Sequence, residues 1–418
     1  MMSRQAFLAT KLSLLSLVCV APLMAADWPQ WLGAQRDGLT SETGLLDSWP
    51  EGGPPSVWIN RDVGLGYSGP AIVEGKIYLM GLRGGVEQLI ALDEASGDEL
   101  WSTDLGPAYT NDWGDGPRGT PTVDGERIYV LAAEGRLSCV DRSTGKVDWS
   151  IELVADLGGA IPVWGYSESP LIDGDLVLVT PGGEQGAIVA LDKNMGKVVW
   201  QSSDLDDGAH YSSLVVAMLH GKKQYVQLLE KRLVGVDPSD GALLWEVPWP
   251  GRVAVIPTPI VQGNQIYVTT GYGVGCMLVE IDAENNAEVL YDNKVMKNHH
   301  GGVVLLGAHI FGHSDSVGWV CQDFATGERV WRERSELGKG AIAYADGHFY
   351  CLSEDEGEVV LIAASPDSWE ERGRFTLTPQ TEQRKPKGKV WTHPVIANGR
   401  LYLRDQELLQ AFDVSAAR

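Results

Sequence analysis

The sequence predicts an all-β protein, an eight-bladed β-propeller whose blades are four-stranded antiparallel sheets. Three observations lead to this prediction. A unit that ends in Asp, then Gly four residues later and Trp four residues after that, recurs along the chain. Each unit contains β-branched and aromatic runs separated by Gly-containing turns, which is the pattern of a hairpin meander. No segment of comparable length has the periodicity of a helix.

The repeat signature has five complete copies and one altered copy. Successive anchoring Asp residues lie 41 to 51 positions apart, which suits one four-stranded blade per unit. The altered copy reads Asp282, Asn286, Tyr291, and Asn is the residue best able to replace Gly in a tight turn. The complete copies are Asp93–Gly97–Trp101, Asp141–Gly145–Trp149, Asp192–Gly196–Trp200, Asp237–Gly241–Trp245 and Asp323–Gly327–Trp331.

The recurring tryptophans are expected to be structural. They fall on the outer strand of most units, where an indole can pack between neighbouring sheets instead of contacting a ligand. Fifteen Trp against six Phe in the whole chain fits such a repeated role. The structural set is Trp58, Trp101, Trp149, Trp200, Trp245 and Trp331.

The second unit illustrates how each blade is built. Its strands are expected at residues 120–123, 127–132, 137–141 and 147–150. The turns between them contain Asp124-Gly125, Glu134-Gly135 and Thr144-Gly145, and such dipeptides favour tight hairpins.

The two ends of the repeat region complement each other. An eighth copy, residues 393–413, stops before its outer strand, whereas residues 56–59 have the pattern of an outer strand without a blade. We expect this N-terminal strand to complete the last blade, so that residues 56–414 form a closed ring with no open edge. Residues 27–55 are then a leader packing on the propeller, and residues 415–418 are a C-terminal tail.

Residues 1–26 have the features of a cleaved signal peptide. Arg4 and Lys11 give a positive start, an uncharged apolar run follows, and Ala25 and Ala26 offer a cleavage site. The run is shorter than the ~20 residues of a membrane span, and no second stretch is long enough to cross a bilayer. Cys19 lacks the small preceding residues of a lipobox. We therefore predict a periplasmic or secreted protein with no lipid anchor and no transmembrane segment after cleavage.

Composition narrows the classes of partner. With 33 Lys+Arg against 56 Asp+Glu, the formal charge is −23, which argues against nucleic acid as a partner. An apolar fraction of 44% excludes wholesale disorder. We expect a monomer. The cysteines of the mature chain form no adjacent pair, CxxC or haem motif, so we expect small buried hydrophobes; they are Cys139, Cys276, Cys321 and Cys351.

Strands ending in ALD, followed by a TG-like turn and Trp, resemble the repeat of pyrroloquinoline-quinone (PQQ)-like propellers. That group includes quinoprotein alcohol dehydrogenases and the outer-membrane assembly protein BamB. The resemblance covers nearly the whole mature chain and is specific for the repeat, but it implies little about activity, because function resides in sites added to a fold. The opening segment from Asp27 to Trp58 also resembles the leader of short exported PQQ-like propellers.

The resemblance to quinoprotein dehydrogenases raises PQQ as a candidate cofactor. Quinoprotein dehydrogenases hold PQQ between a Trp and a pair of adjacent cysteines, with Ca²⁺ bound by carboxylates and an amide. This chain has no adjacent cysteines, and its blade connections are too short for the long insertions of those enzymes. We therefore expect no cofactor, and keep PQQ with Ca²⁺ as the alternative. BamB is lipid-anchored, and this sequence departs from it in lacking a lipobox.

A ligand site is expected at the rim of the central channel, where the loops that enter the innermost strands meet. These loops are rich in aromatic side chains and histidine, which commonly line small-ligand or peptide pockets. His299-His300 beside two glycines is the sharpest feature, although adjacent histidines on an extended chain point apart and suit no shared metal. The rim set is Tyr67, Arg118, Trp164, Tyr166, Glu168, His210, Tyr211, His299, His300, Lys339, Trp391 and His393, with Trp113 beside them.

The sequence contains no nucleophile motif and no metal-ligand spacing. We therefore predict a non-catalytic binding or scaffolding module in the periplasm, whose protein, peptide or small-molecule ligand is met at the channel mouth. The alternative is a PQQ-dependent alcohol or sugar dehydrogenase that uses the same rim as its cofactor pocket, with Arg118 and Lys339 facing the quinone carboxylates. A third reading, an accessory protein of polymer processing, rests only on the aromatic residues.

Overall fold

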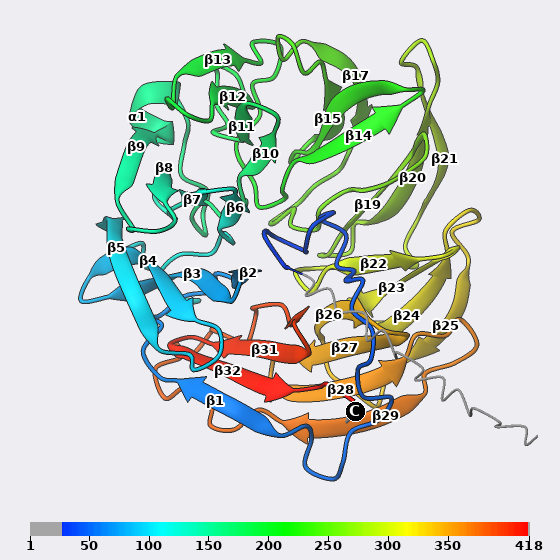
Figure 1. The fold of residues 1–418 in the computed structure, drawn as a ribbon. Helices are drawn as coiled ribbons and strands as arrows, with labels where there is room; N and C mark the ends of the chain where they lie inside the picture. The colour runs from blue at the N-terminus through cyan, green and yellow to red at the C-terminus, as the bar shows by residue number, and fades with distance from the viewer. Residues whose placement is uncertain (1–26, 417–418) are drawn as a thin grey trace, which may run out of the picture.

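The computed structural model describes residues 27–416, and these form eight four-stranded antiparallel sheets arranged in a ring (Figure 1). The predicted eight-bladed propeller is confirmed. The predicted signal peptide lies outside the described residues. Within residues 27–416, no helix has the length and apolar character that crossing a membrane requires.

Each of the first four blades is a meander whose strands run in chain order from the channel outwards. Blade 1 contains β2 (Ala71–Val73), β3 (Lys76–Arg83), β4 (Val86–Asp93) and β5 (Glu99–Pro107). Blade 2 contains β6 (Thr122–Asp124), β7 (Arg127–Leu131), β8 (Arg136–Asp141) and β9 (Val147–Glu152). Blade 3 contains β10 (Leu171–Asp173), β11 (Leu176–Val179), β12 (Val189–Asp192) and β13 (Val198–Gln201), after the short helix α1 (Leu153–Leu157). Blade 4 contains β14 (Val215–Leu219), β15 (Lys222–Leu228), β16 (Arg232–Val236) and β17 (Leu243–Pro248).

The remaining blades repeat this order, except that the last one takes its outer strand from the N-terminal side. Blade 5 contains β18 (Ile260–Gln262), β19 (Gln265–Thr270), β20 (Gly275–Ile281) and β21 (Ala287–Asn293). Blade 6 contains β22 (Val303–Leu306), β23 (His309–Ser314), β24 (Gly318–Asp323) and β25 (Arg329–Glu333). Blade 7 contains β26 (Gly340–Ala345), β27 (His348–Ser353), β28 (Glu358–Ala363) and β29 (Glu371–Thr376). Blade 8 contains β30 (Val395–Ala397), β31 (Arg400–Asp405), β32 (Leu408–Asp413) and β1 (Ser56–Asn60).

The ring closes as the sequence predicts. β1 pairs antiparallel with β32, with Trp58 opposite Ala411 and Asn60 opposite Leu409. The outer edge of the last blade is therefore covered by a strand more than 340 residues away in the chain. This pairing joins the two ends of the ring and satisfies backbone groups that would otherwise form an open edge.

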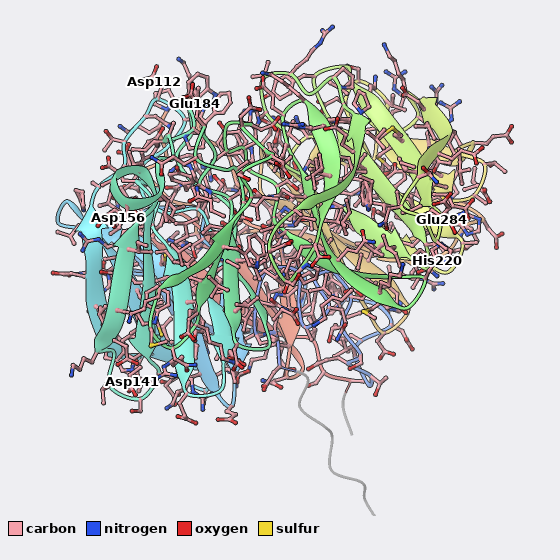
Figure 2. All side chains as sticks on the ribbon, turned by 90° about the horizontal axis from the view of Figure 1, so that it is seen from above. Asp112, Asp141, Asp156, Glu184, His220 and Glu284 are labelled. Carbon is pink, nitrogen blue, oxygen red and sulfur yellow. The ribbon has the colours of Figure 1, made fainter. Side chains whose placement is uncertain are left out.

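The strand count of a blade decides which turns lie on which face. Because the chain reverses at every turn, the loop entering the inner strand and the turn between the second and third strands share one face. Figure 2 shows Asp112, in the loop before blade 2, and Glu184, between β11 and β12, at one end of the molecule, with Asp141 at the other end. We call the first end the mouth face and the second the base face.

The apolar core lies mainly between neighbouring blades. One cluster joins blades 1 and 2 through Tyr78, Leu89 and Ile128, and another joins blades 8 and 1 through Ile72 and Tyr402. These side chains are fully buried, and sheet-on-sheet packing of this kind excludes water from the seams between blades. The four cysteines of the described chain are also buried and free, in agreement with the expectation from the sequence.

The signature Trp of one blade packs on the signature Gly of the next blade. In four successive pairs, a Cβ built on the Gly would lie 2.4–2.7 Å from an indole carbon, which is closer than real Cβ contacts. The same glycines have φ values from +67° to +77°, so both the backbone and the packing require Gly there. The pairs are Trp58–Gly97, Trp101–Gly145, Trp149–Gly196 and Trp200–Gly241.

Blade 4 departs from this packing because its neighbour lacks the glycine. Blade 5 has Asn286 at the signature position, and Trp245 turns back over its own sheet, where its indole N–H donates to Gln224 Oε1 at 2.6 Å. A Cβ on Gly235, the residue opposite Trp245 in the register, would lie 2.2 Å from the ring. In blades 1 and 3 the residue opposite the Trp is alanine. Gly235 therefore makes room for the displaced indole.

Candidate functional site

The mouth face carries a hollow at the centre of the ring, with about 990 Å³ of empty space including the solvent at its opening. Most of its lining comes from the loops that enter the inner strands. Seven of the lining side chains are Trp or Tyr, three are His, and one is Arg. The lining residues are Trp31, Tyr67, Trp113, Arg118, Trp164, Ser167, Tyr211, Ser213, Ala254, Ile256, Tyr272, His299, His300, Trp391 and His393.

The leader, residues 27–55, closes the base of the channel (Figure 1, dark blue). It contacts inner strands or entering loops all round the ring, through backbone hydrogen bonds as well as side chains. Its contacts include Trp28 with Ile72, Pro29 with Val123, Arg36 with Ser169, Pro170 and Leu214, Trp31 with Thr258, Gly38 with Tyr344, and Glu42 with Asn398 and Gly399. The hollow is therefore a blind pocket, with Trp31 of the leader in its lining.

Arg36 is a buried charged residue of the leader. It is 5% exposed, and its guanidinium donates to the carbonyls of Leu214 at 2.9 Å and Ser169 at 3.0 Å and also to that of Pro170. Burial lowers its pKa to about 10, which leaves it charged at neutral pH. A single leader cation thus joins the inner ends of blades 3 and 4.

One wall of the pocket is almost wholly aromatic. The indole of Trp164 lies edge-on to that of Trp113, with ring centroids 5.7 Å apart, and 5.7 Å from the ring of Tyr211. Tyr67 donates a hydrogen bond from its hydroxyl to the carbonyl of Trp113 at 2.6 Å and packs against Trp391. These contacts fix the rings, so the wall is a preformed apolar surface.

Arg118 is the one strongly basic side chain in the lining. Its guanidinium donates to the carbonyls of Gly114, at 2.8 Å, and Gly116, and it lies 4.8 Å from the centroid of the Tyr109 ring. Within residues 27–416, no carboxylate lies within ion-pair distance of it. Burial lowers the pKa of Arg118, and the tyrosines and Glu87 partly offset this effect.

The opposite wall is polar and centred on Glu354. This buried carboxylate accepts a hydrogen bond from the Trp391 indole at 3.0 Å and a short one from His300 Nε2. Burial alone would raise the pKa of Glu354, but the His300 hydrogen bond and charge outweigh burial and lower it to about 2. Glu354 is therefore ionised and already fully partnered by the lining.

His299 is held by a second set of charges. Lys339 Nζ lies 2.6 Å from His299 Nδ1 and 3.0 Å from Asp315 Oδ1. A lysine ammonium has only donors, so His299 accepts at Nδ1 and carries its proton on Nε2. Burial, together with the charges of His300 and Lys339, lowers the pKa of His299 to about 3. The ring is neutral at physiological pH.

His393 completes this wall beneath His300. Its Nε2 donates to the His300 carbonyl at 2.7 Å, and its ring lies 4.7 Å from that of Trp31. Burial lowers the pKa of His393 to about 4. The three histidines of the lining are thus fixed by hydrogen bonds to three different partners, namely Lys339, Glu354 and the His300 carbonyl. Within the described range, no three His, Cys, Asp or Glu side chains gather as a metal site.

The structure brings eight of the twelve rim residues together in the pocket and places four elsewhere. Lys339 stands behind His299. His210 accepts a hydrogen bond from the Val255 amide at Nδ1 and lies beside the pocket residue Tyr211. The eight in the pocket are Tyr67, Arg118, Trp164, Tyr211, His299, His300, Trp391 and His393.

Tyr166 and Glu168 do not reach the rim surface, contrary to the expectation from their loop. Tyr166 is 1% exposed, lies in the core between blades 2 and 3, and donates to the Pro181 carbonyl at 2.9 Å. Glu168 is 2% exposed and accepts from the Thr180 amide at 2.6 Å and its hydroxyl at 3.1 Å. Burial raises the pKa of Glu168 to about 7. Both side chains pack between neighbouring blades. Their position in an entering loop does not by itself show that they point inward.

The rim set predicted from the sequence does not include Trp31, Tyr272, Asp315 or Glu354. Trp31 belongs to the leader, and the other three lie between the second and third strands of blades 5, 6 and 7. Those turns share the mouth face with the entering loops because two strands separate them. Counting strand reversals through each blade would have found these three positions.

The propeller repeat also identifies the family to which the chain belongs. The model of the family described as "Outer membrane protein assembly factor BamB" matches residues 85–333, which is more than half of the chain. The chain belongs to this family. The BamB-family match runs from the third strand of blade 1 to the end of blade 6 and is carried by the propeller repeat, so it assigns the fold and leaves the activity of the mouth pocket open.

The similar proteins include both enzymes and assembly factors. A quinoprotein ethanol dehydrogenase of Pseudomonas aeruginosa is 28% identical over 193 residues, 42% of this chain and 30% of that protein. The BamB of Burkholderia pseudomallei is 26% identical over 218 residues, 50% of this chain and 49% of that protein. The crystal structure of BamB from Moraxella catarrhalis has a TM-score of 0.62 at 18% identity, covering 87% of this chain and 98% of that one, which supports the fold alone. The chain is thus matched over less than half the length of these two curated relatives.

The residues of the pocket do not fit a calcium-bound quinone. Ca²⁺ takes six to eight oxygen ligands, mostly carboxylates and carbonyls, and the lining contains no Asp, Glu, Asn or Gln side chain. The nearest carboxylates, Glu354 and Asp315, are already paired with His300 and Lys339. The sequence has no adjacent cysteines to stack on a quinone ring.

Proposed function

We propose that this BamB-family propeller is a non-catalytic binding module that takes an aromatic or apolar group of its ligand into the mouth pocket. The observation that carries the proposal is the blind, preformed aromatic pocket, closed at its base by the leader and lined by side chains that already hold one another in place. A pocket that is rigid before binding costs little ordering entropy when it is filled.

The surface around the opening supports a ligand larger than the pocket. Val163 is 72% exposed, Val253 55% and Ile161 43%, and all three lie on the loops that surround the mouth. Contiguous exposed apolar side chains beside a pocket commonly mark a binding surface. A protein or peptide partner would then dock on these loops while one of its side chains enters the pocket.

We place this function in the periplasm or outside the cell. The signal-peptide features of residues 1–26 support export, and so does the similarity to BamB, a factor of outer membrane protein assembly. The division into leader, propeller and tail, and the monomeric state, are parts of the same proposal.

The proposal is tested with a neutral apolar dye, N-phenyl-1-naphthylamine, whose fluorescence rises in an apolar site. We expect one saturable site in the mature protein, weakened at least tenfold by Ala254→Trp, which fills the pocket, and by Trp164→Ala. Met195→Gln is the control, because Met195 is an exposed apolar residue on the base face. Dye binding that survives Ala254→Trp, or that is lost equally in the Met195→Gln control, would contradict the proposal.

The alternative function, a PQQ-dependent dehydrogenase, is favoured only by the names of the enzymatic relatives. Titration with PQQ, with and without Ca²⁺, followed by tryptophan quenching and by dye reduction with alcohols and sugars, separates the two. We expect no calcium-dependent binding and no reduction. Saturable, calcium-dependent binding with alcohol oxidation would replace our proposal by the enzymatic one.

A further inference from the structure

The lining of the pocket offers a ligand more hydrogen-bond donors than free acceptors. The carboxylate of Glu354 lies behind the lining and is already paired with His300 and Trp391. The Tyr67 hydroxyl donates to a backbone carbonyl, and the Trp31 indole donates to the hydroxyl of Thr258. The polar groups that remain free to hydrogen-bond a ligand are therefore mainly N–H groups.

Those N–H groups belong to both walls. His299 carries its proton on Nε2, because Nδ1 accepts from Lys339. The indole N–H groups of Trp113 and Trp164 have no hydrogen-bond partner within residues 27–416, and their positions are not closed off from solvent. The ligand that satisfies these donors is rich in acceptor oxygens.

Arg118 adds a full positive charge to the donor set. It uses its two terminal nitrogens on the carbonyls of Gly114 and Gly116, which leaves further N–H groups free. Within residues 27–416 no carboxylate lies within ion-pair distance of it, and Glu87 acts on it only from further away. A partly buried guanidinium without a counter-charge is costly, and a ligand carboxylate would pair with it favourably. Lys339, which lies behind His299, is already paired with Asp315.

We propose, building on the binding function above, that the mouth pocket is selective for a singly charged aromatic carboxylate, whose ring packs on the Trp and Tyr wall while its oxygens accept from Arg118. One free guanidinium balances one negative charge, and the Nε2–H of the neutral His299 adds a hydrogen bond without further charge. A dianion or a metal-bound anion would find no second free cation and no oxygen ligands among the lining residues. The predicted ligand class is therefore a monoanionic planar acid that binds without metal.

The overall charge makes this selectivity a demanding prediction. A protein with a formal charge of −23 attracts cations and repels anions over long distances. Only a local arrangement inside the pocket can reverse that preference. A measured preference for the anionic probe would accordingly be due to the side chains of the pocket and not to the charge of the protein surface.

The test compares three probes of the same size by isothermal titration calorimetry on the mature protein: 1-naphthylacetate, 1-naphthaleneethanol and 1-naphthylethylamine. We expect the acetate to bind at least tenfold more tightly than the alcohol, and the amine to bind most weakly. Equal affinity for acetate and alcohol, or a preference for the amine, would overturn the inference. If no probe binds although the neutral dye does, the inference also fails while the binding function stands. If neither the dye nor any probe binds, both fail.

Variants then locate the selectivity. In Arg118→Gln the acetate should lose its advantage while the alcohol binds as before, and Arg118→Lys should retain part of it. Arg127→Gln is the control, because Arg127 is a half-exposed arginine paired with Asp148 on the base face. Circular dichroism verifies that each variant is folded, and the three-probe comparison on the unaltered protein needs no variant at all. Selectivity that persists in Arg118→Gln would overturn the assignment to this residue.

The pH profile provides a separate readout. Between pH 6 and 8 the acetate affinity should stay constant, because Arg118 remains charged and burial holds the pKa of His299 near 3 and that of His393 near 4. The other ionisable groups on this wall are engaged with one another, His300 with Glu354 and Lys339 with Asp315. An affinity that rises severalfold on acidification through this range would assign the anion to a protonated histidine instead of Arg118.

Discussion

The indole of Trp58, on the strand that closes the ring, lies directly against Gly97 of the first blade. A Cβ built on Gly97 would stand 2.6 Å from two of the ring carbons, and the indole N–H donates to the Glu94 carbonyl at 3.0 Å. The same contact recurs between blades 1 and 2, 2 and 3, and 3 and 4. In blades 1 to 3, each copy of the Asp–Gly–Trp signature therefore takes part in two contacts between blades. Its Gly receives the Trp of the preceding blade, and its Trp packs on the Gly of the following blade.

This contact predicts that Gly97→Ala is costly at the point of ring closure. The added methyl would collide with Trp58, and a left-handed φ of +77° disfavours any L side chain. We expect a loss of about 3 kcal/mol in the free energy of unfolding, measured by urea denaturation. Gly75→Ala is the matched control, since Gly75 has a φ of +75° and nothing within 4 Å of the new methyl. The control should cost only about 1 kcal/mol. Equal losses in the two variants would show that the Trp58 contact contributes nothing.

The displaced Trp245 leads to a second prediction. Alanine in a strand is normally more favourable than glycine, by roughly 0.5–1 kcal/mol, yet Gly235→Ala should destabilise this protein by about 2 kcal/mol. The physical reason is the indole of Trp245, 2.2 Å from the position of the new methyl. The double variant Gly235→Ala with Trp245→Leu should recover part of that loss in a double-mutant cycle. Strict additivity of the two changes would contradict the proposed collision.

The leader should detach more readily when Arg36 is replaced. Arg36→Met leaves the carbonyls of Ser169, Pro170 and Leu214 without their buried donor, at a cost of about 3 kcal/mol. Limited proteolysis with mass spectrometry should then show faster cleavage within residues 27–55. Arg61→Met, which alters an exposed arginine just outside the leader, is the control. An unchanged cleavage rate for Arg36→Met would mean that the other leader contacts suffice.

Acidification should destabilise the folded protein through its buried histidines. Burial lowers the pKa of His393 to about 4, below the ~6.5 of an unfolded chain, so the unfolded state binds the proton first. The contribution of the neutral His393 to the free energy of unfolding is complete above pH 6.5 and is lost progressively as the pH falls towards 4. Glu168 acts in the opposite sense, because burial raises its pKa to about 7 and favours the folded state as the pH falls.

A comparison with His393→Gln isolates the histidine from that opposing effect. Between pH 6.5 and 4.5 the unaltered protein should lose about 2 kcal/mol more free energy of unfolding than the variant does. The measurement is urea denaturation at half-unit pH steps. Parallel pH profiles for the two proteins would mean that His393 does not titrate differently on folding.

Much of the fold was predictable because propeller blades are local. The strands of one blade are neighbours in the chain, so alternating runs and Gly turns identify each hairpin without knowledge of the rest. In blade 2, strands expected at 127–132 and 137–141 are found at Arg127–Leu131 and Arg136–Asp141. Even the closure by β1 followed from local patterns, since one end of the repeat region lacked an outer strand and the other had one to spare.

The site was predictable only in part, because a loop position does not give the direction of a side chain. Trp164 and Glu168 lie four residues apart in one entering loop, yet the first lines the pocket and the second is buried beneath it. The Asp–Gly–Trp spacing likewise predicts a turn and an outer strand, and does not reveal that the Trp meets the glycine of the next blade.

By itself, the sequence determined the repeat, the blade count, the closing strand and the loops that gather at the channel mouth. All of these follow from hydrophobic periodicity and turn chemistry, which act over a few residues. Only the tertiary structure decided that the leader seals the base, that Glu354 pairs with His300, and that no carboxylate among residues 27–416 lies within ion-pair distance of Arg118. Those relationships join segments tens to hundreds of residues apart, and their energies depend on burial and distance, which exist only once the ring has closed.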